Sequence, residues 1–353
     1  GELNGEMVKN LEDNQAILEI KTDRATYTVP AQQINIAAIS EQIGTSVALQ
    51  DIKIQIEIGE PKEDTVKLVE NVADGTFEIV AAPIEFTIRA TYAGTTIEIS
   101  KFSTYVERTI AISDDVDPSK ITTGVVVEPD GTVRHVPTKI TVIDGKYYAV
   151  LNSLTNSIYT VVWHPVEFSD MVNHWAMSAV NDMGSRMVVE GTGNGWFSPD
   201  KNITRAEFAA ILVRGLGLDL ESGETAFSDV KVADWYSGAI RAAHEYGLIS
   251  GYDDGTFGPN DFITREQAMT IIAKAMNLTG LKNRLNTQAA EITLHSFEDE
   301  KEIASWARNG VANVLQAGIV VGRSTNVLAP KGYVTRAEVA VMTQRLLELS
   351  ELI

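Results

Sequence analysis

The second half of the chain contains one segment three times, and this internal repeat constrains the fold more than any other feature. Each copy opens with Phe-x-Asp and contains a tryptophan. A glycine follows the tryptophan after 16 residues, a proline after 24 and a threonine after 29. These markers include the tryptophans Trp175, Trp235 and Trp306, the prolines Pro199, Pro259 and Pro330, and the threonines Thr204, Thr264 and Thr335. A repeat of roughly 55 residues cannot cover its apolar face alone, so the copies are expected to fold as one unit.

Each copy is predicted to form a helix, a loop and a second helix. Small or apolar residues recur 4, 5 and 8 positions after each tryptophan, which defines one face of the first helix. The second helix is predicted to start at the threonine, because Glu207, Gln267 or Glu338 stands three positions later. This spacing is a capping box, in which the two side chains satisfy free N–H groups at the helix start.

An arginine follows the capping threonine in every copy, as Arg205, Arg265 and Arg336. A cation is unfavourable at the positive end of a helix dipole. Free N–H groups beside a guanidinium would form a good seat for a carboxylate or a phosphate. The alternative is a salt bridge to an acid of a neighbouring repeat, for example the Phe-x-Asp aspartate. We expect these arginines to be exposed, so that replacing them leaves the fold intact.

The stretch "GYDDGTFGPNDFITRE", with Phe-Ser-Asp, a Trp-Ala pair and two further copies over residues 168–350, resembles the S-layer homology domain. The resemblance implies that three repeats fold as a pseudo-threefold unit, with one helix of each in a central bundle. It also implies that grooves between repeats hold a secondary cell wall polymer, typically a pyruvylated amino-sugar glycan tethered to peptidoglycan. The signature arginine is then expected to hold the acidic pyruvate ketal, a role that falls to Arg205, Arg265 and Arg336.

The three copies differ at a position that lies at a groove wall in this family. Gly247-Leu248 and Gly318-Ile319 match the family pattern, whereas the first copy has Met187-Val188. A glycine there is expected to adopt a left-handed helix cap and to let a sugar approach the backbone. Methionine suits neither role, so we expect Gly247 and Gly318 to contribute to glycan binding and one or two grooves to be competent.

Other markers of the repeat are given structural roles. The tryptophans are interpreted as core residues on the apolar helical face rather than as sugar-stacking groups. The Phe-x-Asp aspartates are expected to cap the first helix or its loop. "GYDDGTFGPND" is interpreted as a tight turn, because it lacks the alternating acids and final glutamate of a calcium loop.

Residues 1–165 are predicted to be all β, because apolar and polar residues alternate in several short runs. Asp-Gly pairs at 74–75, 130–131 and 144–145 predict tight hairpin turns. We expect a β-sandwich or two lobes, with one short helix around 32–42 and a sub-boundary near 113–120. The repeats are assigned to 166–220, 225–280 and 295–350. The predicted fold is therefore an all-β domain followed by an all-α pseudo-threefold set of helix–loop–helix repeats.

Charge and composition narrow the choice of partners. The net charge of −19 disfavours nucleic acid and anionic membrane surfaces. The chain has no cysteine, and its five histidines are scattered, so no metal site and no cofactor are predicted. No run of about 18 apolar residues is present, so membrane insertion is not expected.

The sequence thus predicts a non-catalytic, extracellular protein anchored to the cell wall by its repeats. Its β half is expected to be a spacer or a module that binds other S-layer or surface proteins, and no catalytic residue is predicted. Two alternatives remain open. The chain could belong to an anchored polysaccharide-active enzyme, although the acids of the first half stand in no recognisable motif. The β half could also bind carbohydrate itself.

Overall fold

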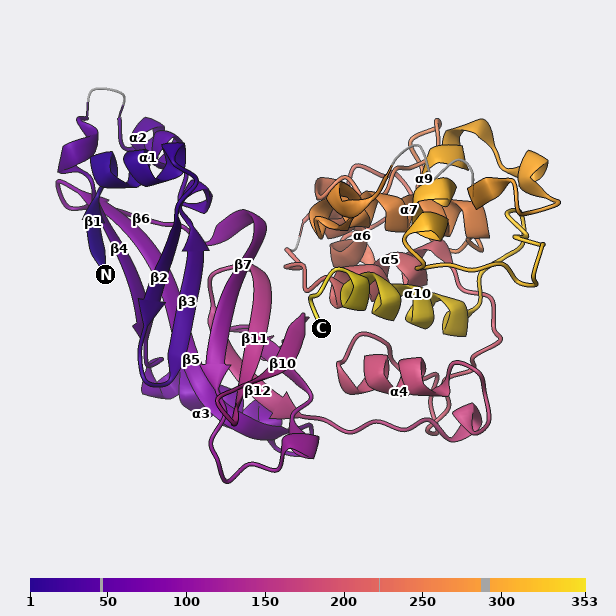
Figure 1. Ribbon diagram of the computed structural model, residues 1–353, viewed down its shortest axis with the longest axis horizontal. Helices are drawn as coiled ribbons and strands as arrows, with labels where there is room; N and C mark the ends of the chain where they lie inside the picture. Colours follow the sequence, from indigo (N-terminus) through magenta and orange to yellow (C-terminus); the bar gives the residue numbers. More distant parts are fainter. Residues whose placement is uncertain (45–46, 222, 287–292) are drawn as a thin grey trace. The chain divides into compact units, whose positions relative to one another are not determined.

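The computed structural model describes residues 1–44, 47–221, 223–286 and 293–353. The chain divides into two compact units, Gly1–His164 and Pro165–Ile353, and each is described by itself. The first unit is coloured indigo to magenta in Figure 1, and the second runs from pink to yellow. No helix within the described residues is both long enough and apolar enough to span a membrane.

Within the described residues, the first unit contains two antiparallel sheets of seven and five strands. The larger sheet has the order β1 (Glu2–Asn4), β4 (Lys53–Gly59), β5 (Glu78–Tyr92), β12 (Ile158–Trp163), β8 (Thr123–Val127) and β9 (Val133–Val136), with β6 (Thr95–Glu98) paired to β5. The smaller sheet has the order β10 (Thr138–Ile143), β11 (Lys146–Thr155), β7 (Lys101–Ala111), β3 (Ala25–Pro30) and β2 (Ile17–Lys21).

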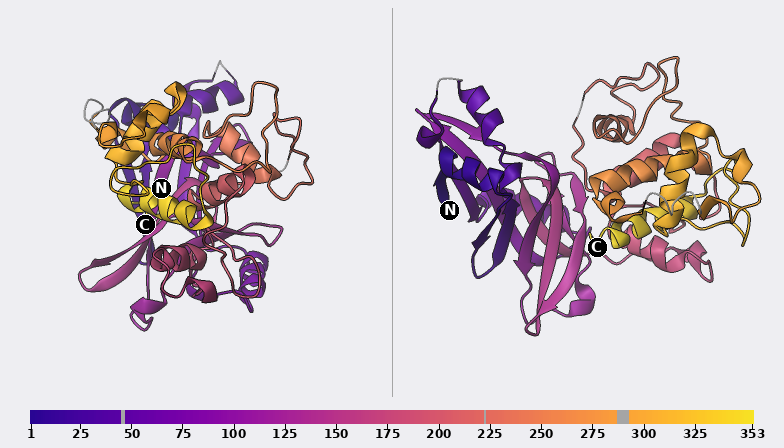
Figure 2. Two further views of the ribbon diagram at one scale, coloured as in Figure 1. Left: turned by 90° about the vertical axis from the view of Figure 1, so that its right-hand side faces the viewer. Right: turned by 45° about the horizontal axis from the view of Figure 1, so that its top comes forward.

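Three α-helices accompany these sheets: α1 (Gly5–Asp13), α2 (Ile36–Ile43) and α3 (Glu63–Ala73). Figures 1 and 2 show α1 and α2 close together at one end of the unit. The 3₁₀ turns η1 (Ala31–Gln33) and η2 (Leu49–Asp51) lie before and after α2, and η3 (Pro118–Lys120) precedes β8. The helix predicted around 32–42 is confirmed as η1 and α2, whereas α1 and α3 were not predicted.

Both sheets contribute to a shared hydrophobic core that includes Tyr27, Phe86 and Tyr159. Each sheet also combines strands from before and after residues 113–120. That segment therefore connects strands within one sandwich-like unit, and it does not separate two lobes. The Asp-Gly pair at 144–145 closes the β10–β11 hairpin and the pair at 130–131 lies between β8 and β9. The pair at 74–75 instead follows the end of α3, so the predicted hairpin there is wrong.

The second unit contains a first and a second helix in each repeat. The first helices are α4 (Met177–Ser185), α6 (Ser237–Glu245) and α9 (Ser305–Gln316), and the second helices are α5 (Arg205–Gly215), α7 (Arg265–Leu278) and α10 (Arg336–Leu349). Short 3₁₀ turns form at η4 (Ser169–Met171), η5 (Leu281–Arg284) and η6 (Glu300–Glu302). All three second helices start with the predicted capping box, in which Thr204, Thr264 and Thr335 pair with the residue three positions later.

Backbone hydrogen bonds join the three repeats in a ring just before these capping threonines. Ile203 N donates to Val334 O at 3.0 Å, Val334 N to Ile263 O at 3.1 Å, and Ile263 N to Ile203 O at 3.2 Å. Every repeat therefore donates one bond to a neighbour and accepts one from the other. The ring sets the starting points of the three second helices side by side, and it requires all three copies.

The Phe-x-Asp aspartates secure the loop that leads to the second helix. Asp170 accepts from Phe197 N at 2.8 Å, Asp229 from Phe257 N at 2.7 Å and Asp299 from Leu328 N at 3.0 Å. In each case the second carboxylate oxygen accepts from the next amide along the chain. The aspartates were expected to cap either the first helix or its loop, and the structure shows that they bind the loop. The first helices begin without a side-chain cap.

The first helices end in a left-handed residue in every repeat. Gly247 and Gly318 have φ values of 67° and 78°, as predicted, and Met187 adopts 62° at the equivalent position. The expectation that methionine would not adopt this conformation is therefore wrong. The bond from Val188 N to Met183 O matches the one from Leu248 N to Ala243 O, so this helix end holds its left-handed residue despite the missing glycine.

We expect Gly247→Met to lower the free energy of unfolding by about 1 kcal/mol, because an L side chain is strained at positive φ. An added Cβ would meet no atom within 4 Å, so strain is the whole effect. Urea denaturation followed by tryptophan fluorescence measures the change. Met187→Gly is the matched variant and should raise stability, and an unchanged midpoint for Gly247→Met would contradict the argument.

Candidate functional site

The three signature arginines are buried, with 6% of Arg205, 2% of Arg265 and 7% of Arg336 exposed to solvent. The expectation that they lie on the surface is wrong. Each guanidinium leaves its own helix start and crosses to the loop of another repeat, where backbone covers it. Burial lowers the pKa of all three arginines, while nearby carboxylates act in the opposite direction.

Backbone carbonyls are the partners shared by all three guanidinium groups. The Nε atoms of Arg205, Arg265 and Arg336 donate to Phe257 O at 2.8 Å, Leu328 O at 2.8 Å and Phe197 O at 2.9 Å. Their Nη2 atoms donate to Ser250 O at 3.2 Å, Val321 O at 3.0 Å and Glu190 O at 2.7 Å. The contacts run from repeat one to two, from two to three and from three to one.

The predicted salt bridge to a Phe-x-Asp aspartate is therefore not formed. The aspartate and the arginine instead hold the same peptide segment from two sides: Asp229 accepts from Phe257 N, and Arg205 donates to Phe257 O. Two arginines do pair with a different acid, the capping glutamate of the neighbouring repeat. Arg265 Nη1 lies 2.7 Å from Glu338 Oε1, and Arg336 Nη1 lies 3.6 Å from Glu207 Oε1.

A pocket of about 500 Å³ lies beside Arg205, in the cleft between the first two repeats. Ser250, Tyr252, Gln267 and Lys274 of the second repeat line it. The third repeat adds Trp306, so all three copies contribute to this pocket. Tyr252 also faces the guanidinium, with its ring centroid 4.8 Å from Arg205 Cζ.

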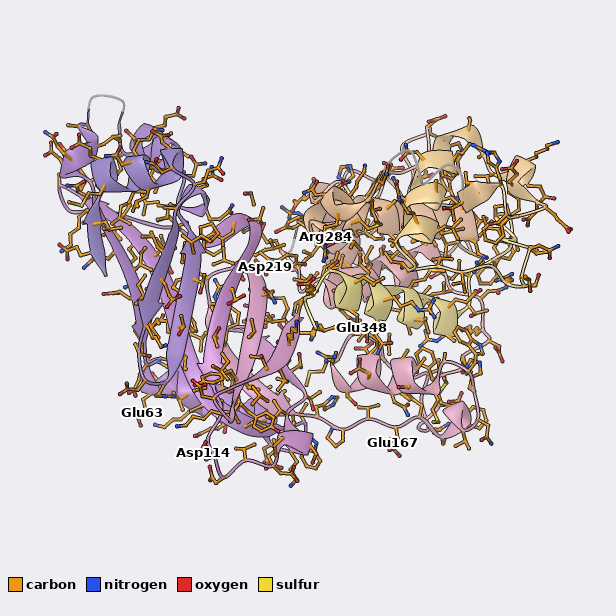
Figure 3. All side chains as sticks on the ribbon, viewed as in Figure 1. Glu63, Asp114, Glu167, Asp219, Arg284 and Glu348 are labelled. Atoms are coloured by element: carbon orange, nitrogen blue, oxygen red, sulfur yellow. The ribbon has the colours of Figure 1, made fainter. Side chains whose placement is uncertain are left out.

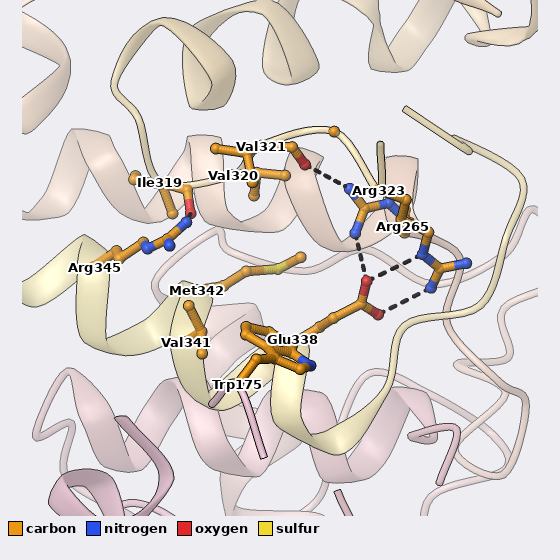
Figure 4. A pocket seen from close by; sticks show the side chains of 11 residues that line it. Trp175, Arg265, Ile319, Val320, Val321, Arg323, Glu338, Val341, Met342 and Arg345 are labelled. Carbon is orange, nitrogen blue, oxygen red and sulfur yellow. Dashed lines mark hydrogen bonds and ion pairs between the residues drawn. The ribbon is translucent and has the colours of Figure 1, made fainter. Parts of the chain in front are cut away.

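An equivalent pocket of about 420 Å³ lies beside Arg265, and Figure 4 shows its lining. Arg323, Glu338 and Arg345 of the third repeat line it, together with Trp175 of the first. The two pockets therefore have the same plan: a signature arginine, a loop and helix of the next repeat, and a tryptophan of the remaining one.

The tryptophans are exposed, at 65% for Trp175, 64% for Trp235 and 58% for Trp306. Their interpretation as core residues is wrong. Trp175 and Trp235 precede the first residues of α4 and α6, so the buried face defined by later positions of the helix does not include them. The sequence signal that sets the tryptophans apart is their identical spacing in the three copies, combined with a place at the edge of the apolar face.

The predicted glycines are not among the residues that line the two pockets. Neither Gly247 nor Gly318 lines them, although Ile319, directly after Gly318, lines the Arg265 pocket. Sequence reasoning missed the cations Lys274, Arg323 and Arg345, which show no motif in the linear sequence. In the described part of the chain, no group of three or more His, Asp or Glu residues could hold a metal ion.

Comparison with known proteins identifies the repeats. The S-layer homology domain model matches residues 167–209, 226–269 and 296–340. An amylopullulanase of Thermoanaerobacterium thermosulfurigenes is 32% identical over 331 residues, which cover 94% of this chain and 16% of that protein. A surface-layer 125 kDa protein of Lysinibacillus sphaericus is 33% identical over 50% of this chain and 14% of its own length. A cellulosome-anchoring protein of Acetivibrio thermocellus is 31% identical over 45% of this chain and 35% of its own length.

The chain is therefore an S-layer homology domain protein, with three such domains in its second unit. These domains indicate anchoring at the cell surface, on the cell wall. The chain spans between about a seventh and a third of the lengths of these three relatives.

We expect Arg265→Ala to lower the free energy of unfolding by about 3 kcal/mol, because it leaves the Leu328 and Val321 carbonyls without this donor and removes one of the two arginines that pair with Glu338. The control is Arg284→Ala, at the surface arginine labelled in Figure 3, whose pair with Glu351 is solvent-exposed. That variant should lose less than about 1 kcal/mol. Chemical denaturation of both variants provides the comparison, and equal small losses would show that the buried contacts contribute little.

Proposed function

We propose that the three repeats form a pseudo-threefold unit that binds an anionic secondary cell wall polymer, a pyruvylated glycan, and so anchors the protein to peptidoglycan. The ring of hydrogen bonds through Ile203, Ile263 and Val334 supports the symmetry, because each repeat makes the same contact to the next. The repeats correspond to residues 166–220, 225–280 and 295–350.

The observation that carries the proposal is the pocket beside Arg205. Its wall combines a buried guanidinium, the ammonium group of Lys274 and the exposed ring of Trp306. Two cations favour an acidic substituent, and an indole ring offers an apolar face against which a sugar ring can pack. A neutral polymer would gain only the contact with the indole ring, and a cationic polymer would be repelled by the two cations.

Arg265 and Arg336 are proposed to contribute to glycan binding at the two related boundaries between repeats. Gly247 and Gly318 are proposed to keep the backbone accessible at the groove wall, and open space beside both residues supports that role. Several weak grooves on one rigid unit that faces a repetitive polymer would give strong retention, because a second contact forms at high local concentration.

For residues 1–165 we propose a non-catalytic spacer or a module that contacts other surface proteins. The support comes from the relatives, which include an amylopullulanase, a surface-layer protein and a cellulosome-anchoring protein. Proteins with such different names each match a large part of this chain. The amylopullulanase also has most of its length outside the matched region, which leaves room there for its catalytic part.

The same relative favours a second candidate, in which the chain is the attachment segment of a polysaccharide-active enzyme. Its match extends over 94% of this chain and so includes the β unit. Incubating the chain with pullulan or starch and measuring new reducing ends tests whether the β unit itself acts on polysaccharide. Release of reducing ends would overturn the spacer proposal and leave the anchoring proposal standing.

We expect Trp306→Ala to weaken binding to purified cell walls about tenfold without unfolding the chain, since removing one stacked ring costs about 1.4 kcal/mol. Co-sedimentation with walls, before and after chemical removal of the secondary polymer, measures the effect. Trp196 is the matched control, because it is equally exposed at 58% but lines neither pocket. Sedimentation that persists after the polymer is removed would refute the anchoring proposal.

A further inference from the structure

The three proposed grooves, one at each boundary between repeats, differ in one residue close to the signature arginine. This residue is the third position of the second helix: Glu207 near Arg336, Gln267 in the Arg205 pocket and Glu338 near Arg265. Two grooves therefore hold a carboxylate at the point where an anionic ligand would meet the guanidinium, and one holds a neutral amide.

In the groove beside Arg265, the carboxylate of Glu338 occupies the position that a ligand carboxylate would take. Its carboxylate lies between two arginines, 2.7 Å from Arg265 Nη1 and 2.9 Å from Arg323 Nη2 (Figure 4). Burial would raise the pKa of Glu338, but hydrogen bonds from Arg323 and the Thr335 amide, with the charge of Arg265, outweigh burial and lower the pKa. The group is therefore ionised at neutral pH, and an incoming carboxylate would have to displace it.

The third groove is neutralised in a similar way. Arg336 has Glu207 at 3.6 Å, and Arg214, which occupies the place of Lys274 in this repeat, pairs with Glu190 at 3.3 Å. A ligand carboxylate would meet two cations that each have a carboxylate nearby, and like charges would oppose its entry.

The guanidinium of Arg205, by contrast, has no paired carboxylate among the described residues. Its Nε and Nη2 atoms donate to carbonyls, and its Nη1 atom has no hydrogen bond or ion pair with any residue that the structure describes. Asp229 and Asp261 favour its charged form from a distance, but they bind the 257–258 amides and the Tyr252 hydroxyl respectively.

Lys274 provides a second cation on the wall of the same pocket, and its only described contact is to Ser250 Oγ at 3.4 Å. Asp253 also lines this pocket, yet among the described residues it forms no ion pair with either cation. Two cations thus remain available for an external anion.

We propose that the Arg205 groove is the principal site for the carboxylate of the wall glycan, and that Gln267 determines this preference by leaving the guanidinium without an internal anion. The inference rests on the proposed function, since it names which of the three grooves performs it. Glu207 and Glu338 reduce anion binding in the other two grooves by occupying the equivalent place.

The test exchanges the deciding residue between grooves. Isothermal titration of the full chain uses the methyl glycoside of an N-acetylhexosamine carrying a pyruvate ketal, with its uncharged methyl ester as the matched probe. Gln267→Glu should weaken binding of the acid at least tenfold and should leave binding of the ester nearly unchanged. The helix start should persist, because glutamate completes the same capping box in the other two repeats.

Two further variants keep the test independent of folding. Lys274→Gln, outside the capping box, should also weaken binding of the acid, whereas Lys282→Gln in η5, away from the pocket, should not. Glu207→Gln should add a second, weaker binding event by freeing Arg336.

Unchanged affinity in both Gln267→Glu and Lys274→Gln would overturn the groove assignment while the anchoring proposal stands. Failure of the unmodified chain to bind either the saccharide or the wall polymer would instead overturn the proposed function, and the groove assignment with it.

Discussion

The second unit depends on one interaction, the hydrogen bonds from a buried guanidinium to backbone carbonyls of the next repeat. Arg205, Arg265 and Arg336 each make two such bonds across a repeat boundary. The helix dipole disfavours a cation at the start of a helix, and hydrogen bonds to the carbonyl oxygens offset this unfavourable interaction. Because the three contacts run in one direction around the unit, every repeat is held by another, and none is complete by itself.

The same contacts create the candidate site. Each loop is held by an aspartate of its own repeat and by an arginine of another, and a pocket opens beside the arginine in two clefts. The arginines therefore contribute both to the stability of the unit and to the candidate site. Removing one of them changes stability and binding together, so the two effects cannot be separated by that variant. The differences between grooves come from positions around the arginine, where a single amide-for-carboxylate change alters the charge that a ligand meets.

The β unit also contains a buried arginine, but this one is surrounded by aromatic rings as well as by carbonyl oxygens. Arg108 is fully buried in the core shared by the two sheets. It donates to Thr155 O at 2.7 Å and lies near the rings of Tyr27 and Tyr159, at 5.0 and 4.9 Å from their centroids. Here carbonyls and aromatic faces replace a counter-ion. The chain's many carboxylates lie largely at the surface instead, as Glu63 and Asp114 do in Figure 3, which is consistent with its acidic net charge.

Local signals in the sequence were sufficient for the repeat, for the second helices with their caps, for the left-handed glycines and for the β character of the first half. Capping and alternation operate within a few residues, so a short window contains the whole cause. Tertiary structure alone decided that the arginines are buried, that the tryptophans are exposed, that Met187 takes a left-handed conformation and that the two sheets of the β half share a core. The buried arginines and the shared core of the β half depend on partners from distant segments: a loop 45 to 146 residues away covers each arginine, and strands from both ends of the β half complete its sheets.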